Sequence, residues 1–266
     1  MIKHFQNEKM ENYMKFAICI PSMLDIEIIS QSTLSIRKNI IEANPEVSFV
    51  LFTNVDNFRQ EDCEGDADDI ISLYSSLESD NCQVDITYTG ERKGYNGATK
   101  YLLTRFTNSD CEHCVFYDDD HEILNPIPIE KIYKILSDGN VYHLGNTYSK
   151  CSSENPFVVK KIKNDDKVIF VENNRNFYTY PGTIFSKSLA LNVLAEADFF
   201  NTSDNAEDVI AKTSAFKEKN IISIFHERDK FDIAEHGDFR IPLDCHYSLD
   251  LRRYRRKTCS DVGNYN

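Results

Sequence analysis

The stretch CVFYDDDHEIL (114–124) decides the fold expected for this chain. Its first four residues suit a strand buried inside a sheet, and three aspartates follow where the strand leaves the core. Side chains alternate along an extended chain, so Asp118 and Asp120 are expected on one side and Asp119 on the other. The stretch therefore predicts a buried strand whose carboxyl end carries a pair of carboxylates.

The Asp118–Asp120 pair has the composition of a metal site. Two neighbouring carboxylates repel each other without a cation, and their oxygens suit Mg²⁺ or Mn²⁺, ions that also hold phosphates. A polar turn in which the aspartates accept hydrogen bonds from nearby backbone N–H groups would explain the same residues without a metal. Because the pair follows a buried strand in mid-sheet, we favour the metal site.

Strands and helices alternate around this stretch. Apolar runs predict strands, and apolar residues at helical spacing predict helices. The expected strands are 15–22, 47–55, 84–90, 141–148, 221–227 and an antiparallel pair 167–174 with 176–182; the expected helices are 26–44, 97–106, 186–197, 201–220 and a short one within 126–136. This order predicts an α/β fold, a Rossmann-like, mixed and mostly parallel sheet with helices on both faces.

Polar residues follow several of the predicted strands. Ligands bind at the carboxyl ends of the strands in such sheets, which brings Pro21, Ser22, Asn54 and Asp56 to one rim. A glycine-bearing loop and helix start follow the strand at 84–90, and their N–H groups together with a lysine suit a diphosphate. That segment contains Gly94, Asn96, Gly97, Ala98 and Lys100. Ordinary turn and cap formation would explain the same residues.

Two later signals also fit catalytic chemistry. Glu207 and Asp208 open the predicted helix at 201–220, where Asp204 as the N-cap and Glu207 three residues later have capping-box spacing. Asp208 at that position could take a proton from an attacking hydroxyl. His226 ends the last predicted strand and could complete a Mn²⁺ site or form a hydrogen bond in the core.

Composition limits the classes of function. The 266 residues carry 30 Lys and Arg against 43 Asp and Glu, a net charge of −13, which makes nucleic-acid binding through the whole surface unlikely. No apolar run approaches the ~20 residues of a transmembrane segment, and the start is too polar for a signal peptide, so we expect a cytoplasmic protein. Residues 61–80 hold eight carboxylates and no lysine or arginine, with a small helix-like apolar island at Ile70, Ile71, Tyr74 and Leu77, and we interpret them as a solvated insertion.

Together these signals resemble the GT-A fold glycosyltransferases, most closely the family-2-like group that uses nucleotide sugars. The resemblance covers residues 15 to 227. FAICIPS and VLFTNVDN stand at the family's loops around the base and ribose, and GYNGATKYLL at its helix start near the donor. YPGTIFSKSLALNVL resembles its glycine-containing segment, and AEDVIAKTSAFKEKN its Glu-Asp motif.

The resemblance implies a metal-dependent transferase that moves a sugar from a nucleotide sugar, with UDP-sugars favoured, to an acceptor hydroxyl. Asp118 and Asp120 would be the Asp-x-Asp (DXD) ligands of Mn²⁺ or Mg²⁺, with His226 as a late histidine ligand. Asp208 would be the catalytic base, next to Glu207. The implied donor contacts are Pro21, Ser22, Asn54, Asp56, Asn96, Gly97, Lys100, Asp119 and Gly182. The acceptor stays open among saccharides, lipids, proteins and modified bases.

The boundaries implied are an N-terminal extension (1–14), a GT-A catalytic domain (15–230) and an irregular basic tail (231–266) that includes RRYRRK (252–257). The chain has no Trp and no Gln-x-x-Arg-Trp segment, which argues against a processive membrane synthase. Two other functions remain. A haloacid-dehalogenase-like phosphohydrolase also uses Asp-x-Asp after a strand, but Glu122 stands where it has Thr or Val. A non-catalytic nucleotide- or carbohydrate-binding domain would keep the fold without turnover.

Overall fold

The computed structural model describes residues 14–58, 64–137, 139–145, 159–165, 168–173, 181–226, 232–233, 239–240 and 245–252. The central sheet contains β1 (Met14–Ser22), β2 (Val47–Val55), β3 (Cys82–Tyr88), β4 (His113–Phe116), β6 (Asn140–Leu144), β7 (Val159–Asp165), β8 (Val168–Asn173), β9 (Thr183–Ser186) and β10 (Asn220–His226).

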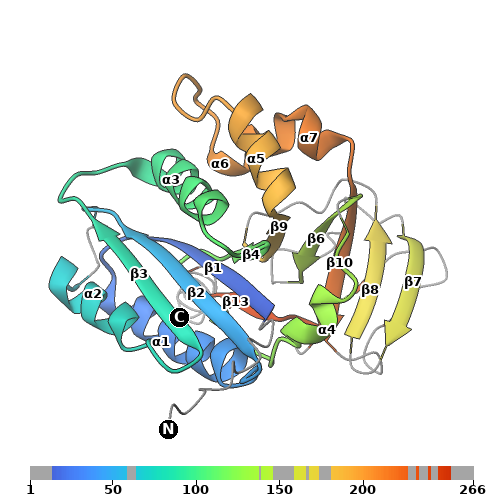
Figure 1. Cartoon of the computed structure of the whole chain (residues 1–266), viewed down its shortest axis with the longest axis horizontal. Helices are drawn as coiled ribbons and strands as arrows, with labels where there is room; N and C mark the ends of the chain where they lie inside the picture. Colours follow the sequence, from blue (N-terminus) through green and yellow to red (C-terminus); the bar gives the residue numbers. More distant parts are fainter. Residues whose placement is uncertain are drawn as a thin grey trace, which may run out of the picture.

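The nine strands form one mixed sheet, in the order β3-β2-β1-β4-β9-β6-β10-β8-β7 (Figure 1). Seven of them run in one direction, and β9 and β8 run in the opposite direction. This confirms the predicted fold class, a mixed and mostly parallel α/β sheet. The first four strands of the order bring the ends of β1, β2 and β4 to one edge of the sheet.

Helices cover both faces of the sheet (Figure 1). One face carries α1 (Ile26–Ile36), α2 (Ala67–Ser75) and α4 (Ile129–Tyr133); the other carries α3 (Gly94–Asn108), α5 (Lys187–Glu196), α6 (Ala206–Lys212) and α7 (Ser214–Lys217). The side chains of β1 alternate between the hydrophobic cores on the two faces of the sheet. Ile18 and Ile20 pack in the core under α1, α2 and α4, and Ala17 and Cys19 pack in the core under α3, α5, α6 and α7. Burial on both faces explains the continuous apolar run of this strand.

The stretch that decides the fold is two strands joined by an acidic turn. β4 ends at Phe116, and β5 (His121–Ile123) leaves the large sheet to pair with β13 (Ser248–Asp250). A further pair, β11 (Asp232–Ile233) with β12 (Phe239–Arg240), lies apart from both sheets. The predicted single strand at 114–124 is therefore interrupted at the aspartates.

The helix predicted over 26–44 continues past α1 as a π-helical turn, Arg37–Ile41. Its last part holds the strand that follows the acidic turn. The side-chain amide of Asn39 donates to the carbonyl of Ile123 at 2.6 Å, and the hydroxyl of Ser35 accepts from the Ile123 N–H at 2.8 Å. Both backbone groups of Ile123 are thus bound by one helical segment, which fixes the end of β5.

The solvated insertion expected over 61–80 is corrected in one respect, because its apolar positions belong to the core. The helix-like island is confirmed: residues 67–75 form α2, and Ile70, Tyr74 and Leu77 are buried. The described carboxylates of this range are exposed, as expected, and two of them form a capping box: Asp66 accepts from the Asp69 N–H at 3.0 Å, and Asp69 accepts from the Asp66 N–H.

Three smaller expectations are also corrected. β8 pairs with β7 and β10, so residues 176–182 are not its partner; of that range, 176–180 lie outside the described residues. The helix expected over 201–220 breaks at Thr213, whose hydroxyl caps α7 by accepting from the Phe216 N–H at 3.3 Å. The N-cap of α6 is Asn205, one residue after the expected Asp204.

Part of the segment predicted to be an irregular tail is packed into the molecule. Besides forming β13, residues 245–252 bury Cys245, Tyr247 and Leu251. The N-terminal extension up to residue 13 and the basic residues 253–257 lie outside the described residues. Within the part of the chain that the structure describes, no helix has the length and apolarity needed to cross a membrane.

Candidate functional site

A pocket of about 240 Å³ lies at the edge where β1, β2 and β4 end. The strands contribute the residues that follow their last apolar positions, and α3 contributes its first turn. Its lining includes Pro21, Ser22, Asp56, Tyr95 and the acidic turn Asp118–Asp120. The sheet therefore brings together several of the polar residues that the sequence placed on one rim.

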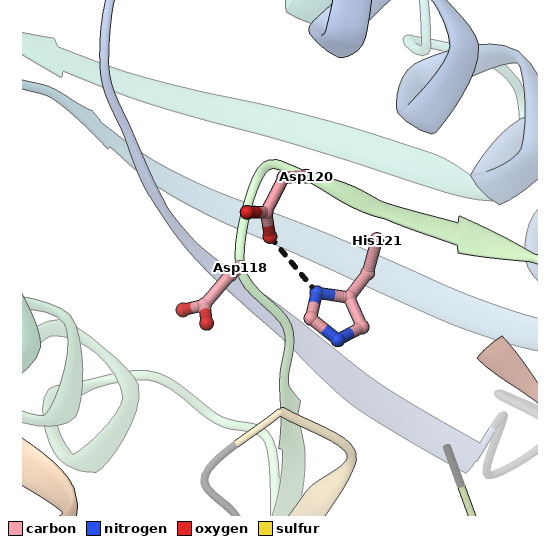
Figure 2. A group of neighbouring side chains, drawn as sticks. All are labelled: Asp118, Asp120 and His121. Atoms are coloured by element: carbon pink, nitrogen blue, oxygen red, sulfur yellow. Dashed lines mark hydrogen bonds and ion pairs between the residues drawn. The ribbon is translucent and has the colours of Figure 1, made fainter. Parts of the chain in front are cut away.

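The acidic turn groups three side chains that could hold a metal ion. One ligand atom each from Asp118, Asp120 and His121 lies within 4.8 Å of the others (Figure 2). Nδ1 of His121 lies 3.1 Å from Oδ1 of Asp120, and Oδ1 of Asp118 accepts a hydrogen bond from the Tyr95 hydroxyl at 3.0 Å. Two carboxylates suit Mg²⁺ or Mn²⁺, and an added imidazole favours a transition ion such as Mn²⁺. The donor set thus fits the metal that the resemblance implies.

The charges of this group depend on one another. Burial, reinforced by Asp120, raises the pKa of Asp118 to about 8. Burial also opposes charge on Asp120, but its hydrogen bond to His121 and the charges of His121 and Arg252 outweigh that effect and lower its pKa. Burial disfavours the charged imidazole of His121, yet Asp120 and Asp118 raise its pKa. A cation bound at Asp118 would favour its ionised form and oppose the effect of burial on this carboxyl.

Asp119 lies outside the three-residue group, in a turn rather than in the extended chain for which alternation was predicted. Its Oδ2 accepts from the Met23 N–H at 2.8 Å and lies 3.4 Å from the Ser22 hydroxyl, which in turn accepts from the buried Tyr74 hydroxyl at 3.2 Å. Burial raises the pKa of Asp119 to about 6, and Arg252 acts in the opposite direction. This carboxylate ties the acidic turn to the end of β1.

Arg252 is the first residue of the basic run 252–257, for which the sequence left three interpretations open: folding over the diphosphate, contact with an anionic acceptor or membrane, or an unstructured basic terminus. Its guanidinium nitrogens lie 3.5 Å from Oδ1 of Asp119, 3.5 Å from Oδ2 of Asp120 and 3.6 Å from Oδ2 of Asp25. These contacts with the acidic turn were not predicted. His121 was missed as a possible ligand too, although it directly follows the aspartates.

Asp56 anchors the start of α3 beside the pocket. Its two carboxylate oxygens accept from the N–H groups of Lys93 and Gly94, each at 2.8 Å. Gly94 has a φ of +67°, a conformation that favours glycine, so the turn and the helix start are both set locally. Next to it, the Arg92 guanidinium lies 4.0 Å from the centre of the Phe58 ring. A cation and an aromatic ring thus form one wall of the pocket.

The remaining donor candidates do not line the pocket. Asn54 is buried in β2. The Asn96 amide donates to the carbonyl of Asp204 at 2.9 Å, and Lys100 lies over the Phe200 ring at 4.7 Å. Gly97 is buried within α3, where an added Cβ would lie 3.2 Å from the Cβ of Lys93. These residues hold α3 against its neighbours rather than facing the cavity.

Gly182 is a residue of the sheet. Its φ is +90°, its N–H donates to the Phe116 carbonyl at 2.6 Å, and its carbonyl accepts from the Leu144 N–H at 2.7 Å. An added Cβ would lie 2.5 Å from the Leu144 carbonyl oxygen. The close approach of these three segments requires glycine at this position.

The late candidates lie outside the three-residue group. Glu207 and the exposed Asp208 open α6, where the Asp208 N–H donates to the Asn205 side chain at 2.9 Å. His226 ends β10, and its ring centre lies 5.9 Å from that of Tyr247. The described residues thus associate His121, not His226, with Asp118 and Asp120. The roles of Glu207, Asp208 and His226 stay predictions.

No family model matches this chain, and no curated protein matches its sequence. Solved structures do match its fold. The S. aureus TarS fragment 1–349 matches with a TM-score of 0.54 and 16% sequence identity. The same fragment in complex with UDP matches with a TM-score of 0.55 and 14% identity, and S. aureus TarS with a TM-score of 0.53 and 15% identity. The matches cover 94% of this chain, but 66% of the fragments and 40% of TarS. TarS is a glycosyltransferase, and at these identities the likeness shows that the two proteins share a fold.

Proposed function

We propose that this protein is a metal-dependent glycosyltransferase that moves a sugar from a nucleotide-sugar donor to an acceptor hydroxyl. The observation that carries the proposal is the group of Asp118, Asp120 and His121, whose two carboxylates line a pocket at the carboxyl edge of the sheet. This is the position where α/β sheets bind ligands. Many proteins have metal sites, and the fold that this chain shares with a glycosyltransferase is the reason to propose sugar transfer for this one.

A uridine nucleotide is the donor base that we favour. One of the TarS structures that match this fold holds UDP. In this chain, the pocket that contains the acidic turn also contains Pro21, Ser22 and Asp56, the residues expected to meet the nucleotide. The Phe58 ring and the Arg92 guanidinium on its wall could pack against a base.

The proposed reaction needs charge neutralisation at the leaving group and a base at the acceptor. A bound Mn²⁺ or Mg²⁺ would stabilise the leaving nucleoside diphosphate as a Lewis acid. Asp118, Asp120 and His121 would hold that ion, while Asp119 keeps the acidic turn against Ser22 and Met23. The Tyr95 hydroxyl, which donates to Asp118, orients one of the carboxylates.

Asp208 is the proposed general base. Its support is indirect: the Asn96 side chain binds the Asp204 carbonyl, so the loop before α6 is attached to the helix that lines the pocket. Asp208 is exposed and can therefore exchange protons with solvent between turnovers. Replacing it with Asn should nearly abolish sugar transfer and leave donor binding intact. Unchanged turnover in Asp208→Asn would remove it from the mechanism.

The test of the proposal is a thermal-shift panel of UDP, GDP, CDP and ADP, each with Mn²⁺ and with EDTA. A ligand that binds the native state raises the melting temperature. We expect one nucleotide, UDP, to stabilise the wild type in Mn²⁺ alone and to lose this effect in Asp120→Ala. Asp110→Ala is the matched control, because Asp110 pairs with Lys15 near the opposite end of β4. An absence of any nucleotide response would contradict the proposal.

Donor hydrolysis separates the transferase from a binding domain of the same fold. Glycosyltransferases transfer the sugar slowly to water when no acceptor is present, so the wild type with Mn²⁺ should release UDP from a UDP-sugar. A domain that has lost turnover would show nucleotide binding without release. A phosphohydrolase would instead release inorganic phosphate from the nucleotide.

A further inference from the structure

Arg252 brings a fixed positive charge to the acidic turn. Its side chain is 12% exposed, and it lies against carboxylates from two segments, Asp25 at the start of α1 and Asp119 and Asp120 in the turn. The N–H of Leu251 donates to the carbonyl of Asp120 at 2.8 Å, and β13 pairs with β5 just before it. The backbone therefore holds the guanidinium in this position.

Asp120 is shared between this cation and the possible metal ligands. Its Oδ1 lies 3.1 Å from His121, and its Oδ2 lies 3.5 Å from the guanidinium. A divalent ion bound by Asp118, Asp120 and His121 would place a second cation on the same carboxylate. Because both interactions are largely desolvated, repulsion between the two cations would be only weakly screened.

We infer that Arg252 and the divalent ion compete for Asp120, so that Arg252 is a positioning residue that weakens binding of the free metal. The inference rests on the proposed function, since it takes the three-residue metal site as given. Coupling between two ligands is reciprocal: if Arg252 weakens metal binding, metal binding weakens the hold of Arg252 on the turn to the same extent. The segment after β13 is then linked to metal occupancy.

A purely structural role for Arg252 makes the opposite prediction. If the guanidinium only held the acidic turn in shape, its removal would disorder the ligands and lower metal affinity. Competition predicts that removal raises metal affinity. The sign of the change in the Mn²⁺ dissociation constant therefore separates the two roles without any measurement of activity.

The experiment is a calorimetric titration of Mn²⁺ into the nucleotide-free protein, which measures the Mn²⁺ dissociation constant. We expect Arg252→Gln to bind Mn²⁺ about fivefold tighter than the wild type or more, the lower end of typical coupling between sites. Arg105→Gln is the control, because exposed Arg105 pairs with half-buried Asp85 away from the pocket and should leave Mn²⁺ affinity unchanged. An unchanged or weaker Mn²⁺ affinity in Arg252→Gln would overturn the inference.

Arg252→Lys keeps the test valid if the glutamine variant fails to fold. Lysine retains the charge but lacks the planar fork that reaches several carboxylates together, so Mn²⁺ affinity should lie above that of the wild type. An affinity equal to or below that of the wild type contradicts competition. If the wild type binds no Mn²⁺, the metal site of the proposed function fails and the inference with it. If the wild type binds and no Arg252 variant binds tighter, competition alone fails.

Discussion

The protonation of Asp118 links pH to the metal site. Its pKa is raised to about 8, chiefly by burial, so the metal-free protein carries a neutral Asp118 at pH 6 and a mostly ionised one at pH 9. A metal ion binds the carboxylate, so binding must release this proton. Mn²⁺ affinity should therefore rise with pH up to about 8, on the order of tens of fold from pH 6, and then level off.

Mn²⁺ titrations at several pH values, with Asp118→Asn as the comparison, measure this effect. The asparagine variant should bind more weakly and lose most of the pH dependence between 6 and 8. A wild-type affinity that is flat over this range would contradict the raised pKa. The same shift acts on stability: the folded state holds the proton more tightly than the unfolded state, so this contribution to folding is present at low pH and is lost as pH rises through about 8.

Gly182 gives a prediction about stability rather than chemistry. Alanine there must adopt a φ near +90° and place its Cβ 2.5 Å from the Leu144 carbonyl oxygen. We expect Gly182→Ala to lower the free energy of unfolding by about 2 kcal/mol or more, from backbone strain and the shift of β6. Urea unfolding measures it. Gly139→Ala is a suitable control, since the nearest atom to its added Cβ lies 4.0 Å away.

At the scale of elements, the π-helical turn after α1 binds β5, the strand that follows the acidic turn. Asn39 binds the Ile123 carbonyl, and a leucine in its place would leave that buried carbonyl without this donor. Asn39→Leu should therefore cost about 1–3 kcal/mol of stability and weaken Mn²⁺ binding as well, because β5 begins at His121. Denaturant unfolding and a Mn²⁺ titration on the same variant check both effects. Loss of stability with full Mn²⁺ affinity would show that β5 is held by its other contacts.

The elements that could be predicted from the sequence are those whose pattern is local. The run at 47–55 gave β2 with its bounds, since a strand buried on both faces needs no partner to be recognised. The pairing of Asp118 with Asp120 was predicted from alternation along an extended chain, whereas these residues lie in a turn. The break of the strand at the aspartates was not predicted, because it depends on pairing of β5 with β13, more than 120 residues away.

The parts of the site that were missed depend on contacts between distant segments. Asn39 looks like an ordinary polar residue of a helix until Ile123 lies beside it. Arg252 looks like one cation of a basic run until three carboxylates surround it. The acidic segment at 64–80 was predicted correctly in its exposed carboxylates and in its helical apolar positions. The packing of that helix against the core was missed, because it depends on residues outside the segment.

At the scale of the molecule, the segment after residue 244 completes both the core and the pocket. β13 pairs with β5, and Tyr247 and Leu251 are buried. A chain ending at residue 244 should unfold at a lower temperature and bind Mn²⁺ more weakly, because it loses the partner of the strand that carries His121. Thermal unfolding and a Mn²⁺ titration test this, and Arg252→Gln in the full chain separates loss of the strand from loss of the charge. An unchanged melting temperature would show that β5 does not need β13.

The pairing of β5 with β13 also delays completion of the site during synthesis on the ribosome. About 130 residues separate the acidic turn from the segment that closes over it. At 5–20 residues per second, roughly 6–26 s pass between the emergence of the two. During that interval the nascent chain carries its aspartates without Arg252 and without the second strand. The ligand site is thus incomplete until β13 and Arg252 have been translated, about 130 residues after its first aspartates.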